Sequence, residues 1–305
     1  MTNVAVIGAG EMGGWFARQY AQKGLELRIA DADHQKAHAL ASELGAFSGP
    51  TEEIIPKSDE VLIATPLDTA EGIINAHQHL LKGKTVYDIA SVKNGIPEAL
   101  AQASGKSLSL HPMWGGATNG FENQNLIMIP LHPLEGAYQS HFDGLKQRFE
   151  GYGTRVTMLH HGEEHDRLMA WNTALYHFNN LAMGLALSRS GMPASRHQQV
   201  EGTTATLSRI CAEAVAHSDP TLYFSIQTKN PYVREAHEVL WQCFSHLKDV
   251  VQEGNYGAFA KVMQQASAYF MEGKDPQNYL KKAMSQFAAA VGAAKGAEFR
   301  HVLAT

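Results

Sequence analysis

Three glycines near the start of the chain narrow the possible folds more than any other feature. Gly8, Gly10 and Gly13 form the pattern G-x-G-x-x-G in VAVIGAGEMGGWFARQY, between an apolar strand-like run and a helix-like run. In a βαβ unit the first glycine permits a tight turn, the second lets the backbone approach a pyrophosphate, and the third lets the helix pack on the strand. The segment therefore predicts a dinucleotide-binding Rossmann domain, in which Glu11 and Met12 of the same loop also contact the cofactor.

The residues that follow later strands indicate which dinucleotide is bound. Asp31 ends the second strand-like run, where a carboxylate accepts hydrogen bonds from the adenosine ribose and repels a 2′-phosphate. No Arg or Lys follows at once in ADADHQK, so we predict NAD rather than NADP as the cofactor. Thr65 and Pro66 end another strand at the edge that lines the cofactor cleft, and we expect them to contact NAD too. The alternative is a domain of this fold that binds another nucleotide or none.

Short apolar runs alternate with helix-like runs over the first half of the chain. We expect strands at residues 4–7, 25–30, 60–65, 85–90, 107–111, 125–130 and 154–159. We expect helices at residues 12–22, 35–44, 69–81, 97–103 and 136–150. This alternation is typical of a parallel sheet that is covered by helices on both faces.

The strand pattern stops near residue 160. The second half has apolar residues at helical spacing, which predicts helices at residues 163–188, 195–217, 232–253, 255–271 and 276–297. The sequence thus predicts an α/β Rossmann domain at 1–160, followed by an all-helical substrate and dimerisation domain at 161–305.

Composition excludes several kinds of partner. The formal net charge of −5 gives no basic surface for nucleic acid or for an anionic membrane. No apolar run reaches the roughly 18–20 residues of a membrane span, and NVAVIG already reads as a strand rather than a signal peptide, so we expect a cytoplasmic protein. Cys211 and Cys243 are interpreted as small buried core residues in a reducing compartment.

Two loops after neighbouring strands carry the candidate chemistry. Ser91 lies in DIASVKNG, and His111 begins HPMWGGATNG at the end of the next strand. A dehydrogenase needs a base that takes the hydroxyl proton as hydride leaves carbon, and histidine suits this role. Ser91 is expected to bond to the same substrate oxygen, and glycines such as Gly115 leave room for a small-molecule substrate against the backbone.

The motifs GAGEMG, DIASVK, HPMWGG and EEHDRLMAWNTALYHFNNLAMGLALS occur in this order over roughly residues 4–250. Together they resemble the prephenate/arogenate dehydrogenase family of tyrosine biosynthesis. The resemblance implies an NAD-dependent oxidative decarboxylation in which His111 accepts the C4 hydroxyl proton of a cyclohexadienol ring, with Ser91 as its partner. It also implies that His177 lies near the substrate and that the helical domain forms a homodimer.

The chain departs from this family at one position. The family has an arginine that holds the ring carboxylate, shortly before a segment that resembles SDPTLY. When this chain is aligned on SDPTLY, Ala214 stands at the position of that arginine. Arg209 lies five residues earlier and is the candidate replacement, with Lys229 and Arg234 as further cations. Because alanine cannot replace a bidentate arginine, an altered ring such as an amino-substituted prephenate is an alternative substrate.

Other function classes remain open from the sequence. A β-hydroxyacid or imine-reducing dehydrogenase has a similar glycine motif but typically relies on a catalytic lysine in its second domain. A dehydrogenase fold reused as an NAD-responsive binding protein would account for the missing arginine, although Ser91 and His111 argue against it. A metal site at His161 and His165 is the weakest hypothesis, because no further ligand pattern completes it, and we predict none.

Overall fold

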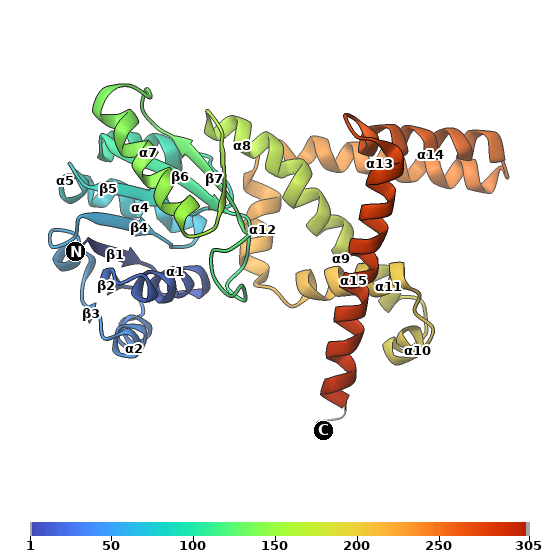
Figure 1. Ribbon diagram of the computed structural model, residues 1–305, viewed down its shortest axis with the longest axis horizontal. Coiled ribbons are helices and arrows are strands. Elements are labelled where there is room, and N and C mark those ends of the chain that lie inside the picture. Colours follow the sequence, from blue (N-terminus) through green and yellow to red (C-terminus); the bar gives the residue numbers. More distant parts are fainter. Residues whose placement is uncertain (1, 303–305) are drawn as a thin grey trace. The chain divides into compact units, whose positions relative to one another are not determined.

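A computed structural model describes residues 2–302 of the chain. The chain forms two compact units (Figure 1). The first unit contains the residues up to Ala170 together with Phe224–Pro231, and the second contains Trp171–Tyr223 and the residues from Tyr232 onwards. A short segment of the second half of the sequence therefore belongs to the first unit. The domain boundary expected between residues 160 and 161 stays a prediction.

The first unit is built on one sheet of eight strands in the order β3-β2-β1-β4-β5-β6-β7-β8. The strands are β1 (Asn3–Ile7), β2 (Glu26–Ala30), β3 (Phe47–Ser48), β4 (Glu60–Ile63), β5 (Thr85–Asp88), β6 (Lys106–Pro112), β7 (Asn125–Pro130) and β8 (Arg155–Met158). The first six run parallel, as expected, but β7 pairs antiparallel to β6. The expectation of a wholly parallel sheet is wrong here, because no crossover helix lies between β6 and β7 to return the chain.

Helices cover both faces of this sheet (Figure 1). The helices are α1 (Glu11–Gln22), α2 (His34–Leu44), α3 (Thr51–Ile54), α4 (Leu67–Ala76), α5 (Gln78–Leu81), α6 (Ile96–Ala103), α7 (Gly136–Gly151) and α8 (Gly162–Met169). Apolar residues of α1, α2 and α7 form one core with the sheet, and those of α3 to α6 form the other. Successive strand residues face opposite cores, which explains why the strands read as continuous apolar runs.

The second unit is helical, as expected. Its elements are a π-helical segment (Ala170–Ala174, which begins in the first unit), α9 (Leu175–Ser188), α10 (Ala194–Gln199), α11 (Thr203–Ala216), α13 (Val233–Gln252), α14 (Tyr256–Met271) and α15 (Pro276–Val302). A further helix, α12 (Pro220–Lys229), was not expected, and its last part belongs to the first unit. The single helices expected at 163–188 and 195–217 are interrupted by the π-helical segment and by the break before α11.

Many apolar side chains of the second unit are exposed. Trp241 and Tyr256 are 72% and 83% exposed, and none of the described residues of α9 and α14 is buried. Cys211 and Cys243 are exposed as well, so their interpretation as core residues is wrong. An apolar surface of this extent on a helical unit is typical of a protein–protein interface. No helix in the described part of the chain has the length and apolar character that crossing a bilayer requires.

A buried ion pair joins α7 to the sheet and gives a test of this fold. The Arg148 guanidinium donates to both carboxylate oxygens of Glu60 at 2.6 and 2.8 Å, and both side chains are largely buried. We expect Arg148→Met to lower the free energy of unfolding by about 3 kcal/mol, because it leaves a buried carboxylate without its partner. Arg18→Met, which breaks a solvent-exposed pair with Glu43, should change the free energy of unfolding far less. Urea denaturation measures both, and equal losses would contradict the prediction.

Candidate active site

The glycine motif follows β1 and forms a contact that only glycine permits. Gly8 has a φ of +107°, and a Cβ there would lie 2.4 Å from the carbonyl oxygen of Ala64. A Cβ at Gly13 would lie 1.9 Å from the carbonyl oxygen of Gly8. The backbone of α1 is thus in direct contact with the turn after β1, and that turn with the end of β4.

The predicted cofactor residues fit a dinucleotide. The space around the Gly10 Cβ position is open to 4 Å, and no side chain caps α1 there. An uncapped helix N-terminus of this kind offers N–H groups to a phosphate. Asp31 accepts the backbone N–H of Ala9 at 2.6 Å, so its carboxylate lies beside the motif. The buried Oγ1 of Thr65 has no hydrogen-bond partner among the described residues and is available to a ligand.

The glycine-rich loop after His111 is tied to α1. A carboxylate oxygen of Glu11 accepts the Gly116 N–H at 2.9 Å, and the Trp15 indole N–H donates to the Thr118 carbonyl at 2.6 Å. A Cβ at Gly116 would come within 2.5 Å of the Glu11 side chain, whereas the Gly115 position is only in van der Waals contact with it. Glu11 therefore leaves no room for a side chain at Gly116, and its bond to the Gly116 N–H holds the loop beside the dinucleotide motif.

His111, the residue before the last of β6, lies in a chain of buried polar groups. Its Nδ1 lies 2.8 Å from Nε2 of His165, and Nδ1 of His165 lies 2.8 Å from Oδ1 of Asp166. Burial lowers the pKa of His111 well below its ordinary value and that of His165 to about 3, and it raises the pKa of Asp166 to about 6. Both imidazoles are therefore neutral at neutral pH, and Asp166 is mostly ionised.

These contacts set the positions of the imidazole protons. An ionised Asp166 accepts a hydrogen bond, so His165 carries its proton on Nδ1 and accepts with Nε2. His111 then donates from Nδ1 to His165. The Nε2 of His111 keeps its lone pair and can accept a proton from a substrate, as a general base must.

The side chain of Lys93 is completely buried next to these polar groups. Its ammonium donates to Oδ1 of Asp88 at 2.7 Å and to the Leu110 carbonyl at 2.6 Å. Its backbone N–H donates to the Asp166 carboxylate at 2.9 Å. The Ser109 hydroxyl donates to the other oxygen of Asp88. One lysine therefore joins β5, β6 and α8.

The other predicted residues lie in several places. Ser91 is half-buried in the loop between Asp88 and Lys93, and within the described residues it is His165, not Ser91, that bonds to His111. Pro66 caps the start of α4, and Met12 lies in the first turn of α1. The roles expected for these side chains stay predictions.

The two predicted substrate residues of the second unit have different surroundings. The ring of His177 in α9 lies tilted against the ring of Tyr223, with the two ring centroids 4.3 Å apart. Its buried Nδ1 has no hydrogen-bond partner among the described residues. Arg209 of α11 binds Glu201 at 2.6 Å and Glu213 at 2.8 Å. Two carboxylates already occupy the guanidinium, which weakens the case for Arg209 as a substrate clamp.

His165, Asp166 and Lys93 were not predicted as site residues. His165 entered the sequence analysis only as a metal ligand with His161, yet here it bonds to His111 and Asp166. The adjacent His-Asp pair in the first turns of α8 was the available signal, because a buried imidazole needs a partner. Among the described residues, no group of three side chains able to hold a metal ion comes together.

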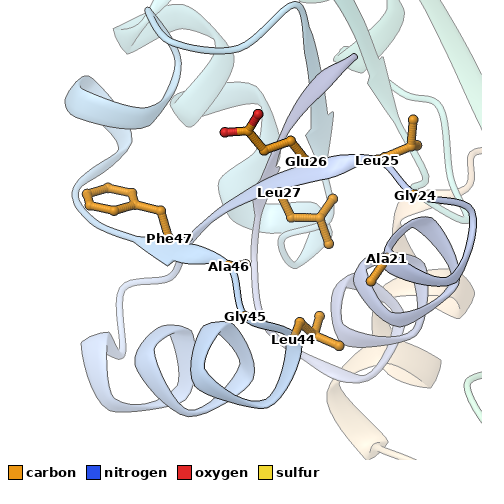
Figure 2. Close-up of a pocket in the computed structure, with 9 residues that line it drawn as sticks. All are labelled: Ala21, Gly24, Leu25, Glu26, Leu27, Leu44, Gly45, Ala46 and Phe47. Atoms are coloured by element: carbon orange, nitrogen blue, oxygen red, sulfur yellow. The ribbon is translucent and has the colours of Figure 1, made fainter. Parts of the chain in front are cut away.

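A separate pocket lies at the amino end of β2, away from the strand ends that carry these residues (Figure 2). It has a volume of about 560 Å³ and is lined by Ala21, Gly24, Leu25, Glu26, Leu27, Leu44, Gly45, Ala46 and Phe47. Glu26 is its one titratable lining residue, so the pocket has none of the acid–base pairs that the His111 region contains.

Two family models match most of the chain. The model described as the prephenate dehydrogenase nucleotide-binding domain matches residues 16–158, and the model of the prephenate dehydrogenase dimerization domain matches residues 161–265. A probable arogenate/prephenate dehydrogenase of Methanocaldococcus jannaschii is 26% identical over 92% of this chain. The chain spans less than two thirds of that relative, 64% of its length. A 4-amino-4-deoxyprephenate dehydrogenase of Streptomyces pristinaespiralis is 25% identical over 84% of this chain and 87% of its own length.

Solved structures share the fold. Prephenate dehydrogenase from A. aeolicus, in complex with hydroxyphenyl propionate and NAD⁺, has a TM-score of 0.72 and 22% identity. The similarity covers 89% of this chain and 98% of that one. Synechocystis arogenate dehydrogenase has a TM-score of 0.68 and 18% identity over 88% of this chain. The Rossmann domain followed by a helical domain is thus confirmed as the fold class.

Two glycine substitutions should separate folding from cofactor binding. Gly10→Ala places a methyl group in open space at a backbone conformation that alanine adopts, so we expect an unchanged melting temperature. The methyl group would meet the pyrophosphate and weaken NAD⁺ binding at least about tenfold. Gly13→Ala should instead destabilise the protein, because its Cβ overlaps the Gly8 carbonyl. Thermal denaturation and calorimetric titration with NAD⁺ measure the two effects, and similar behaviour of both variants would contradict the prediction.

Proposed function

Since models of both of its domains match, the chain belongs to the prephenate dehydrogenase family, and we propose that it oxidatively decarboxylates prephenate or arogenate with NAD⁺. The observation that carries the proposal is His111. Its Nε2 is left as an acceptor by the bond to His165, and the loop that follows it is tied to the dinucleotide motif by Glu11. A proton acceptor therefore lies at the sheet edge where a Rossmann domain holds the reactive end of its cofactor.

The proposed chemistry assigns one step to each group. Bound NAD⁺ supplies the hydride acceptor. His111 takes the C4 hydroxyl proton as hydride leaves C4, and the ring carboxylate departs as CO₂. The ring becomes aromatic, which makes the step effectively irreversible. The His165–Asp166 pair stabilises the imidazolium that forms on His111, because the carboxylate balances its charge.

Further residues are proposed for binding. Ser91 bonds to the same C4 oxygen, and the bare backbone at Gly115 leaves room for the ring. His177 is proposed as a further substrate contact, since its buried Nδ1 has no hydrogen-bond partner among the described residues. Asp31 holds the adenosine ribose of NAD, and Thr65 and Pro66 lie along the cofactor.

We also propose a cytoplasmic homodimer that forms through the helical unit. The exposed apolar side chains of α9, α13 and α14 are the surface that a second copy would cover. The dimerization-domain model matches this part of the chain, which supports the assignment.

An amino-substituted prephenate is the second candidate substrate. Ala214 stands where the family resemblance places an arginine, and Arg209 already binds two carboxylates. A site with one fewer free cation favours a substrate that carries an ammonium group of its own. The similarity to a 4-amino-4-deoxyprephenate dehydrogenase supports this candidate.

Turnover with three substrates tests the proposal. Purified protein and NAD⁺ are mixed with prephenate, arogenate or 4-amino-4-deoxyprephenate, and NADH absorbance is recorded. We expect NADH with prephenate or arogenate, and a fall of about 10²- to 10⁴-fold in kcat for His111→Asn. NADH with the amino compound alone would select the second candidate. If the protein binds NAD⁺ but forms no NADH with any of the three compounds, the proposed reaction is wrong, although the assignment of the fold still holds.

The pH profile gives a separate test of the role of His111. Its pKa is held well below 6.5 mainly by burial, and His165 and Lys93, which face it, act in the same direction. As the pH falls, Asp166, whose pKa is about 6, becomes protonated before His111, and its protonation already removes the proton arrangement that leaves Nε2 of His111 as an acceptor. We therefore expect kcat/KM to be flat above about pH 7, to begin to fall near pH 6 and to stay low at lower pH. Steady-state rates between about pH 5 and pH 8 measure this. An acid limb centred at or above 6.5 would show that another group is the base.

A further inference from the structure

We propose that Lys93 is a positioning residue that fixes both the place and the proton arrangement of His111. The inference rests on the proposed function, because it concerns the same base. Lys93 does not reach the substrate in this account and is not a catalytic residue. It acts through two groups on either side of His111, Leu110 in the strand and Asp166 in α8.

The first route goes through the side chain. The Lys93 ammonium donates to the carbonyl of Leu110, the residue before His111, at 2.6 Å. Asp88 holds the ammonium from the other side at 2.7 Å and also accepts the Ser109 hydroxyl. The end of β6 is therefore fixed to a charged group rather than only to its neighbouring strands.

The second route goes through the backbone. The Lys93 N–H donates to both oxygens of Asp166, at 2.9 and 3.2 Å, and the Asn230 side chain donates to the Asp166 carbonyl. The Lys93 N–H and the nearby ammonium favour the ionised carboxylate, because both act against the burial that raises the pKa of Asp166. An ionised Asp166 keeps the His165 proton on Nδ1, and only this arrangement leaves Nε2 of His111 free to accept a proton.

A purely structural role is the competing explanation. A buried ammonium without a partner would destabilise any fold, and Asp88 satisfies it. That role accounts for the ammonium bonds to Asp88 and Leu110, but it does not require the contact between the Lys93 N–H and Asp166. The two explanations differ in what happens when the ion pair is replaced by neutral groups that still pack.

The test is the double variant Lys93→Met with Asp88→Asn, which removes the buried charges and keeps similar volumes. The matched control is Arg148→Met with Glu60→Gln, a second buried pair at the amino end of β4. Urea denaturation and NAD⁺ titration first establish that both proteins fold and bind cofactor. Protein labelled with ¹⁵N-histidine then reports which ring nitrogen of His111 and of His165 carries the proton, with His111→Asn and His165→Asn as assignment controls.

We expect the Lys93 double variant to lose on the order of 10²-fold in kcat with little change in KM, whereas the control keeps its rate. The His111 spectrum should shift from the Nδ1-protonated form toward a mixture, because Asp166 keeps the backbone N–H of residue 93 but loses the nearby ammonium, which also favours its ionised form. Unchanged kcat and an unchanged His111 spectrum would overturn the inference and leave Lys93 a structural residue.

Two further outcomes can be told apart. If the double variant does not fold, the ¹⁵N spectrum of the wild-type protein still tests the inference, because a proton on Nε2 of His111 would overturn the second route. If the wild-type protein turns over none of the substrates, the proposed reaction fails. The ¹⁵N spectra of the wild type and the variant then still test whether Lys93 sets the proton arrangement.

Discussion

The complete burial of the Lys93 ammonium is the constraint on which the candidate site depends. A charge without access to water must find its partners inside the protein, and here they are Asp88 and the Leu110 carbonyl. Because Asp88 ends β5 and Leu110 lies near the end of β6, the ion pair holds the carboxyl edge of the sheet next to His111. The backbone of the same lysine holds Asp166. Lys93 thus joins the sheet to α8 close to the place where His111 of β6 meets His165 of α8.

Much of the fold could be predicted because its signals are local. The turn after β1 needs glycine at Gly8 and Gly13, since any Cβ there would strike backbone atoms, and the sequence shows this requirement directly. The apolar strands and the helices between them can also be predicted from the pattern of residues within each segment. His111 was predicted for a related reason. A strand end beside a dinucleotide motif is where parallel sheets place their chemistry.

The parts that could not be predicted depend on contacts between distant segments. His165 and His111 are 54 residues apart, and nothing in either segment alone shows that the two rings meet. Lys93 stood in a recognised motif, but its burial became visible only once Asp88 and Asp166 lay on either side. The antiparallel β7 was missed although the link before it has no helix. Cys211 and Cys243 were expected to be buried because cysteine usually is. Both lie on a helical unit that leaves many apolar side chains exposed, so residue type alone does not predict their burial.

The charges of α11 extend the argument to substrate choice. Arg209 with Glu201 and Glu213 makes a cluster whose carboxylates outnumber its cation, so the cluster does not attract a further carboxylate. Ala214 adds no charge beside it. A prephenate carries two carboxylates and no cation, whereas arogenate and an amino-substituted ring each carry an ammonium that offsets one of them. Removing one cation from a binding site weakens the binding of a dianion more than the binding of a substrate with a lower net charge. If the proposed reaction uses Arg209 as its substrate clamp, these charges support the ammonium-bearing candidates over prephenate.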